Sequence, residues 1–248
     1  MPPMQSEKPN KVIREAASVL VMRNGSHGPE VFMLQRPGRG VFPDLHVFPG
    51  GKVDADDAFL GDHLAPPQSA NHPAPKFKAA ALRECFEECG VLYAETQDGP
   101  LDAKEQQRFR ADVLNQRVSF KDYFERSTLR FQDDAVLYFS HWITPEFAPA
   151  RFDTRFFIAR VPETQSAQNY AGETVAGGWQ TPAEALQHYA EKNWQMIMPT
   201  LTTLRMIASY DDVESLMATV QRGSHRIPVT EALHKQGMQY YVGTWCSS

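Results

Sequence analysis

Leu82-Arg83-Glu84-Cys85-Phe86-Glu87-Glu88-Cys89-Gly90 is the stretch that decides the fold of this chain. At roughly 100° per residue, its apolar side chains follow the i, i+3, i+4, i+7 rule and share one helical face. The three glutamates fall on the opposite face, within about a quarter turn of one another. Gly90 suits the left-handed position just past a helix end. The pattern predicts a helix over residues 77–89 that is buried on one side and acidic on the other.

The three crowded carboxylates have two interpretations. Like charges at helical spacing repel by a few tenths of a kcal/mol per pair, which a solvated acidic face tolerates. The alternative is a site for a hard cation, since Mg²⁺ binds carboxylate oxygens together with waters and substrate phosphates. The helix alone does not decide between them.

Upstream of the helix lies a Gly/Pro-rich loop over residues 37–51, which contains Phe48-Pro49-Gly50-Gly51. Paired glycines allow backbone amides and carbonyls to approach a ligand closely. Residues 58–76 are Pro-rich and aperiodic, and are predicted to form a loop between this glycine pair and the helix.

The remaining pattern is mixed. Strands are predicted at residues 16–22, 30–35, 136–144 and 155–161, with a turn at 23–29. Helical patterns cover residues 102–126, 181–190 and 199–220, whereas residues 221–248 carry no clear pattern. Strands and helices do not alternate as regular βαβ units, so the sequence favours an α/β/α sandwich around a mixed sheet.

Composition excludes several classes of protein. Hydrophobic residues make up 42% of the chain, as in an ordinary globular protein with a real core. The net charge of −5 argues against nonspecific nucleic-acid binding. The sequence shows no signal-peptide pattern, no apolar run long enough for a membrane helix, and no disulfide framework among Cys85, Cys89 and Cys246. A cytoplasmic protein with no membrane partner is the expectation.

Together, the glycine loop and the acidic helix resemble the Nudix hydrolase family, whose signature is G-x5-E-x7-R-E-U-x-E-E-x-G-U, with U a bulky apolar residue. Gly51 matches the first glycine, and Arg83 to Val91 match the second half. Two departures are visible: Asp57 stands where the family has Glu, and about 18 residues are inserted before Arg83. Loop insertions of this length cost little free energy. The resemblance implies the Nudix α/β/α sandwich, here as a single domain over residues 1–248 with an insertion at 58–76 and a C-terminal helical extension from about residue 199.

The resemblance also implies roles for individual residues. The metal ligands would be Glu84, Glu87, Glu88 and the carbonyl of Gly50, with Mg²⁺ or Mn²⁺ as the cofactor. Glu84 is the family-based choice of general base, although which glutamate serves is left open. The same likeness makes Gly51, Asp57, Arg83 and Gly90 structural parts of the signature, with a salt bridge between Arg83 and Asp57.

Three further residues are candidates outside the signature. Glu173 lies where many family members place an additional ligand or base, and an exposed loop glutamate is the alternative. Arg36 and Arg155 could bind substrate phosphate through the planar guanidinium. For Arg155, an ion pair with Asp153 is an equally good interpretation.

Residues 141–162 and 172–186 resemble one subgroup, the coenzyme A diphosphatases of the Nudix motif 19 type, which also carry an insertion inside the signature. This likeness implies a small-molecule nucleotide substrate, coenzyme A or acyl-coenzyme A, cleaved to 3′,5′-ADP and 4′-phosphopantetheine, and it admits a homodimer. Two alternatives remain: an ADP-ribose or NADH pyrophosphatase, and a ligand sensor that binds without cleaving. Intact glutamates and the lack of a basic helix-turn-helix segment argue against the sensor.

Overall fold

The structure, a computed structural model, describes residues 12–38, 43–67, 72–169, 175–225 and 239–242 of the 248-residue chain. Its centre is a mixed sheet in the order β10-β7-β8-β1-β2-β3, with β4 paired to β1 and β9 paired to β2. Among the named strands of the described residues, β1 and β8 pair in parallel and all other pairs are antiparallel. None of the helices in the described part of the chain is both long and apolar enough to span a membrane.

The sheet strands span the following bounds: β1 Ile13–Gly25, β2 Gly28–Gln35, β3 His46–Val47, β4 Gly50–Lys52, β7 Val136–Ile143, β8 Arg151–Arg160, β9 Ala176–Gln180 and β10 Gln239–Val242. A separate pair is formed by β5 (Ala94–Glu95) and β6 (Arg130–Phe131). Strand β1 is central, and its apolar run is buried on both faces, as continuous apolar strands are. Val19 and Val21 pack on one face, while Leu20 and Met22 pack on the other.

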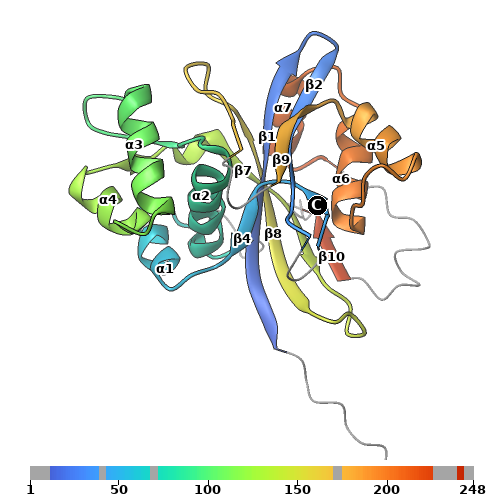
Figure 1. Ribbon diagram of the computed structural model, residues 1–248, viewed down its shortest axis with the longest axis horizontal. Coiled ribbons are helices and arrows are strands. Elements are labelled where there is room, and N and C mark those ends of the chain that lie inside the picture. Colours follow the sequence, from blue (N-terminus) through green and yellow to red (C-terminus); the bar gives the residue numbers. More distant parts are fainter. Residues whose placement is uncertain (1–11, 39–42, 68–71, 170–174, 226–238, 243–248) are drawn as a thin grey trace, which may run out of the picture.

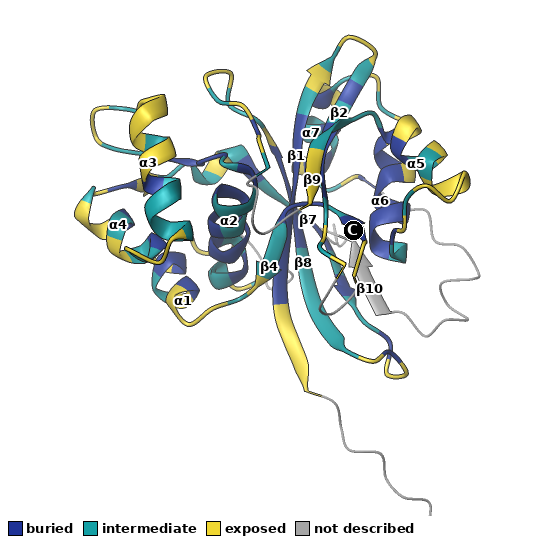
Figure 2. Cartoon of the chain, in the orientation of Figure 1, coloured by how far each residue is buried: buried dark blue, intermediate teal, exposed yellow. Residues whose placement is uncertain are grey.

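Seven α-helices cover the two faces of the sheet in the described ranges (Figure 1). On one face lie α1 (Asp56–Gly61), α2 (Pro75–Cys89), α3 (Ala103–Leu114) and α4 (Phe120–Arg126). On the other lie α5 (Pro182–Ala190), α6 (Met198–Ile207) and α7 (Val213–Gln221). Figure 2 shows buried residues along the sheet and on the helix sides that face it. The predicted α/β/α sandwich around a mixed sheet is therefore confirmed.

Helix α2 has one buried apolar face and one acidic face, as predicted. Leu82, Cys85, Phe86 and Cys89 are at most 2% exposed, whereas the glutamates of the same helix are half-buried. The two thiols lie side by side, with the Sγ atoms 3.5 Å apart. Gly90 adopts a φ of 76° and donates its N–H to the carbonyl of Phe86, as predicted for the residue past a helix end.

Two loop predictions were wrong in part. The loop predicted at 37–51 contains the short strands β3 and β4. Within 58–76, helix α1 continues to Gly61 and α2 begins at Pro75, because Leu60 is fully buried and supplies an apolar anchor that the Pro-rich composition masks. Residues 68–71 of this insertion lie outside the described residues.

The helical pattern at 102–126 is two helices. Asp102 caps α3 and Ser119 caps α4, each accepting hydrogen bonds from backbone N–H groups of its first turn. Between them Gln116 has a φ of 56°, which a continuous helix excludes. The Thr181-Pro182-Ala183-Glu184 capping signature is confirmed as a reciprocal capping box at the start of α5.

Candidate active site

The glycine loop and the acidic helix meet. The backbone N–H of Gly50 donates to Glu88 Oε2 at 2.7 Å. A Cβ placed on Gly51 would lie 2.2 Å from Glu84 Oε1, and one on Gly50 would lie 2.4 Å from the carbonyl oxygen of Ala17. The paired glycines therefore let β4 fit between β1 and the carboxylates of α2, where any side chain would collide.

Arg83 connects the two halves of the signature. Its guanidinium makes a two-point contact with Asp57, with Nε–Oδ1 and Nη2–Oδ2 both at 2.9 Å. It also donates to the carbonyl of Lys52 at 3.0 Å and, through Nη1, to Glu84 at 3.0 Å and Glu87 at 3.2 Å. Burial alone would lower the pKa of Arg83, but the bonds to Asp57 and the charges of the three carboxylates raise it. The predicted salt bridge is present.

The shorter carboxylate at position 57 is compatible with this contact. Asp57 lies in the first turn of α1, which packs on α2, and its side chain is fully buried. Its Oδ2 also accepts the backbone N–H of Asp54 at 2.7 Å. Helix α1 begins just before the insertion and packs on α2, so the shorter aspartate side chain reaches the guanidinium.

Glu88 is a carboxylate of the candidate site whose surroundings disfavour its charged form. Its pKa is raised well above the usual value, first by burial and next by the neighbouring charge of Glu84. The N–H of Gly50 and the positive charge of Arg36 act in the opposite direction. Arg36 follows β2 directly, with its backbone N–H bonded to the carbonyl of Leu45, so its charge lies at the same end of the sheet.

The donor set fits a hard divalent cation. All the candidate donors are carboxylate or carbonyl oxygens, and the mutual repulsion of Glu84 and Glu88 is the kind that a bound cation relieves. Over the described ranges, no group of three His, Cys, Asp or Glu side chains forms a ready-made metal cage. Mg²⁺ commonly keeps waters and uses substrate oxygens beside one or two carboxylates, so a complete cage is not required.

Arg155 has the alternative contact that the sequence left open. It forms an ion pair with Asp153, which also binds His141 Nε2 at 2.6 Å. Its guanidinium carbon lies 4.6 Å from the ring centre of Phe77, near the other end of α2 from the glutamates. A phosphate-binding role for Arg155 stays a prediction, and the structure favours the ion pair. Glu173 falls in residues 170–174, outside the described residues.

Two sets of contacts that support the glycine loop and helix α2 were not predicted from the sequence. His46 stacks on Trp194 with ring centres 4.0 Å apart, and the backbone N–H of His46 donates to the carbonyl of Gln195 at 2.8 Å. Arg110 of α3 donates to the carbonyl of Glu87 at 3.0 Å. No sequence pattern pointed to either, because both contacts join segments far apart in the chain.

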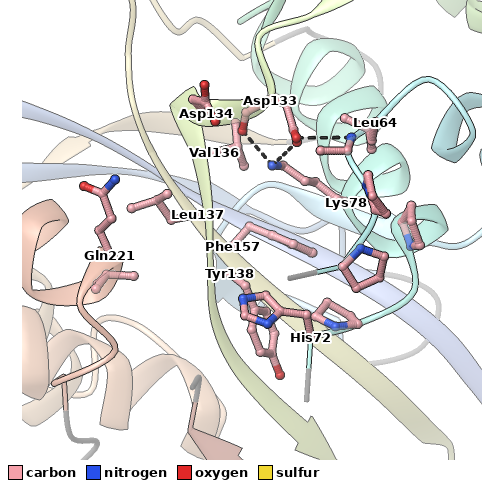
Figure 3. Close-up of a pocket in the computed structure, with 16 residues that line it drawn as sticks. Leu64, His72, Lys78, Asp133, Asp134, Val136, Leu137, Tyr138, Phe157 and Gln221 are labelled. Atoms are coloured by element: carbon pink, nitrogen blue, oxygen red, sulfur yellow. Dashed lines mark hydrogen bonds and ion pairs between the residues drawn. The ribbon is translucent and has the colours of Figure 1, made fainter. Parts of the chain in front are cut away.

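A cavity of about 200 Å³ lies elsewhere, between the insertion, β7 and the end of α7 (Figure 3). Lys78 of α2 borders it and is held by the carboxylate and the carbonyl of Asp133, while Phe157 and Tyr138 line it from the sheet. None of the signature glutamates lines this cavity. The candidate site is therefore the contact of β4 with α2, not this cavity.

Known proteins resemble this chain in sequence and in fold. The family model described as NUDT19 Nudix domain matches residues 63–207, more than half of the chain. A protein of Caenorhabditis elegans named "Putative nudix hydrolase 7" is 28% identical over 203 residues, covering 80% of this chain and 62% of its own length. The human "Acyl-coenzyme A diphosphatase NUDT19" is 25% identical over 238 residues, covering 77% of this chain and 64% of its own. The chain thus spans less than two thirds of either relative.

Among solved structures, a NUDIX hydrolase from Alicyclobacillus acidocaldarius is similar over 85% of this chain and 97% of its own, with a TM-score of 0.71 and 27% identity. The fold, the paired glycines against the acidic helix, and the match over residues 63–207 lead to one conclusion: this chain belongs to the NUDT19 Nudix domain family.

Proposed function

We propose that the protein is a divalent-metal-dependent diphosphatase that cleaves coenzyme A or acyl-coenzyme A, releasing 3′,5′-ADP and a 4′-phosphopantetheine. The observation that carries this proposal is the contact of Gly50 and Gly51 with the carboxylates of Glu88 and Glu84. The substrate class is supported by the name of the human relative.

In this proposal, Glu84, Glu87, Glu88 and the Gly50 carbonyl hold Mg²⁺ or Mn²⁺. The bound ion would supply charge compensation for the diphosphate and a water of lowered pKa. Arg83 orients Glu84 and Glu87 through its Nη1 while Asp57 holds the rest of the guanidinium. Arg36 contributes positive charge for the substrate phosphates beside Glu88. Glu84 is the proposed general base, with Glu173 as a further candidate.

The test is a hydrolysis assay of the full chain with Mg²⁺ or Mn²⁺ over coenzyme A, acyl-coenzyme A esters, ADP-ribose and NADH, with products identified by mass. Glu87→Gln and Glu88→Gln should reduce turnover to background with an unchanged melting temperature, because both side chains lie opposite the apolar face of α2. Glu125→Gln, on the exposed side of α4, serves as the matched control.

Each outcome of this assay has a clear meaning. Release of 3′,5′-ADP supports the proposal, whereas cleavage of ADP-ribose or NADH alone keeps the chemistry and discards the substrate. Wild-type turnover in either glutamine variant would contradict the metal assignment. Tight binding of a nucleotide without cleavage would favour a ligand sensor.

A further inference from the structure

Helix α3 presents two polar side chains to the end of α2. Gln106 and Arg110 lie four residues apart and so share one face. Arg110 donates through Nε to the carbonyl of Glu87 at 3.0 Å and through Nη1 to the carbonyl of Gln168 at 3.1 Å. Gln106 Nε2 donates to the carbonyl of Gly90 at 2.7 Å and to Gln165 Oε1 at 2.7 Å. Neither residue belongs to the Nudix signature.

These bonds satisfy carbonyls that a helix end leaves without intrahelical partners. The carbonyl of Glu87 is bonded by Arg110, and that of Cys89 by the backbone N–H of Gln168 at 2.9 Å. A cation at the C-terminal end of a helix also interacts favourably with the helix dipole. The last turn of α2, which carries Glu87 and Glu88, is therefore held in place by side chains from outside the helix.

Gly90 makes room for this contact. A Cβ at residue 90 would lie 2.7 Å from Arg110 Nη1, in addition to the strain of a φ of 76°. The glycine of the signature is thus required for two reasons, the helix end and the passage of the guanidinium. Arg110 reaches the backbone of α2 only because residue 90 has no side chain.

The same group of bonds fixes a third segment. Gln165 exchanges two hydrogen bonds with the backbone of Leu92, both at 2.8 Å, and so pairs with it as a strand would. Residues 165–168 are in this way tied to the chain that follows α2. Arg110 is the one side chain among the bonds described here that joins this segment directly to the carbonyl of a candidate metal-binding residue.

We propose that Arg110 is a positioning residue for the metal-dependent reaction, holding the last turn of α2 so that the carboxylates of Glu87 and Glu88 keep their place opposite Gly50. The inference rests on the proposed function. Arg83 fixes the carboxylates of Glu84 and Glu87 from one side, and Arg110 fixes the backbone that carries them from the other. Because Mg²⁺ demands near-ideal octahedral geometry, a small displacement of this turn weakens binding of the ion.

The experiment compares Arg110→Gln and Arg110→Lys with Arg108→Gln in the full chain. Arg108 lies on the same helix with its side chain 86% exposed, so it controls for loss of a positive charge. Binding of Mn²⁺ is measured without substrate by electron paramagnetic resonance, and kcat and KM for coenzyme A are measured well below the melting temperature. Arg110→Gln should weaken Mn²⁺ binding and lower kcat by about tenfold to a hundredfold, the usual effect of removing a group that orients metal ligands. Arg110→Lys should be intermediate, since an ammonium lacks the planar fork that spans two carbonyls.

Arg110→Gln with wild-type Mn²⁺ affinity and wild-type kcat, even at a lower melting temperature, would overturn the inference and leave Arg110 as a purely stabilising residue. The same holds if Arg108→Gln weakens Mn²⁺ binding equally. Should Arg110→Gln fail to fold, Arg110→Lys supplies the comparison. If the wild-type chain binds Mn²⁺ but hydrolyses none of the substrates, the proposed function fails while the Mn²⁺ affinities still decide the role of Arg110. A wild-type chain that neither binds Mn²⁺ nor hydrolyses any of the substrates overturns both.

Discussion

Among single residues, Arg83 and Asp57 form the most buried ion pair of the site. The side chain of Asp57 is 0% exposed and that of Arg83 is 8% exposed. Removing one partner of a buried pair leaves the other charge uncompensated, which costs about 3–5 kcal/mol. Because Arg83 keeps contacts with Glu84, Glu87 and Lys52, the lower end of that range applies here.

Asp57→Asn should therefore lower the free energy of unfolding by about 3 kcal/mol in urea denaturation. Asp56→Asn is the matched control, since this neighbour has a side chain 50% exposed and only a 3.8 Å contact with Lys121. The free energy of unfolding of the Asp56→Asn variant should stay within about 0.5 kcal/mol of the wild-type value. If both substitutions lowered the free energy of unfolding equally, the buried ion pair of Arg83 and Asp57 would not be the source of the stabilisation.

A second prediction at this scale concerns pH. Burial lowers the pKa of His225, and the bond of Nε2 to the carbonyl of Phe139, at 2.7 Å, only partly opposes this. At pH values just below 6.5, the ordinary pKa of histidine, the native state therefore binds fewer protons than the unfolded state. The stability that this residue contributes is present above pH 6.5 and is lost as the pH falls.

The free energy of unfolding should drop between about pH 7.5 and about pH 5.5, and the drop should be smaller in His225→Gln, which does not titrate. His46 and His72 also have lowered pKa values, so the measured quantity is the difference between wild type and variant. An identical pH dependence in both proteins would rule out His225 as a contributor.

Single-residue predictions from the sequence succeeded where a local pattern dictates one role. The left-handed Gly90, the buried thiols of α2 and the pairing of Arg83 with Asp57 all follow from helical spacing or from the signature. Arg155 could not be decided, because the nearness of Asp153 along a strand allows an ion pair as readily as an anion site. The role of Arg110 could not be seen at all, since it depends on where α3 packs.

At the scale of elements, strand β4 and helix α2 form the candidate site together, and the two adjacent glycines of β4 have different neighbours. A Cβ on Gly50 would meet backbone, at 2.4 Å from Ala17 O and 2.6 Å from Ser18 Cα. The three atoms nearest to a Cβ on Gly51 all belong to the carboxylate of Glu84. Backbone cannot give way within the pairing of β1 and β4, whereas a side chain can move.

Gly50→Ala should therefore destabilise the protein by about 3 kcal/mol, the upper part of the range for overpacking. Gly51→Ala should leave the melting temperature nearly unchanged and reduce hydrolysis of coenzyme A, because it displaces Glu84. Gly178→Ala in β9, with nothing within 4 Å of the added Cβ, is the control for replacing a glycine. Full activity of Gly51→Ala, or a wild-type melting temperature of Gly50→Ala, would contradict the different roles predicted for the two glycines.

Element boundaries were predictable where capping residues or apolar runs mark them, as at α2 and α5. They were not predictable where tertiary packing overrides composition. Leu60 draws the start of the Pro-rich insertion into the core as α1, and pairing with β2 and β1 turns the glycine loop into β3 and β4. Short strands of this kind owe their existence to partners that the local sequence does not reveal.

At the scale of the whole molecule, the sheet separates two hydrophobic cores. One lies under α1 to α4 and includes the apolar face of α2; the other lies under α5 to α7 and includes Phe48 of the glycine loop. The elements of the candidate site therefore pack against both hydrophobic cores, one on each side of the sheet. The fold class was predictable from the mixed strand and helix pattern, but the division of helices between the faces was not, because amphipathic periodicity does not say which face of a sheet a helix covers.

The parallel pairing of β1 with β8 has a consequence for how the protein is made. Residues 13–22 pair with residues 151–160, which leave the ribosome about 140 residues later, or roughly 7 to 30 seconds at ordinary rates of synthesis. Until then β1 lacks its longest partner, and β4, which is anchored on β1, has no completed sheet to rest on. The acidic helix is therefore synthesised after β1 and β4 but well before β8 completes the sheet that it packs against. Nascent chains that end before β8 therefore expose apolar residues of β1, and we expect chaperones to bind this exposed hydrophobic surface.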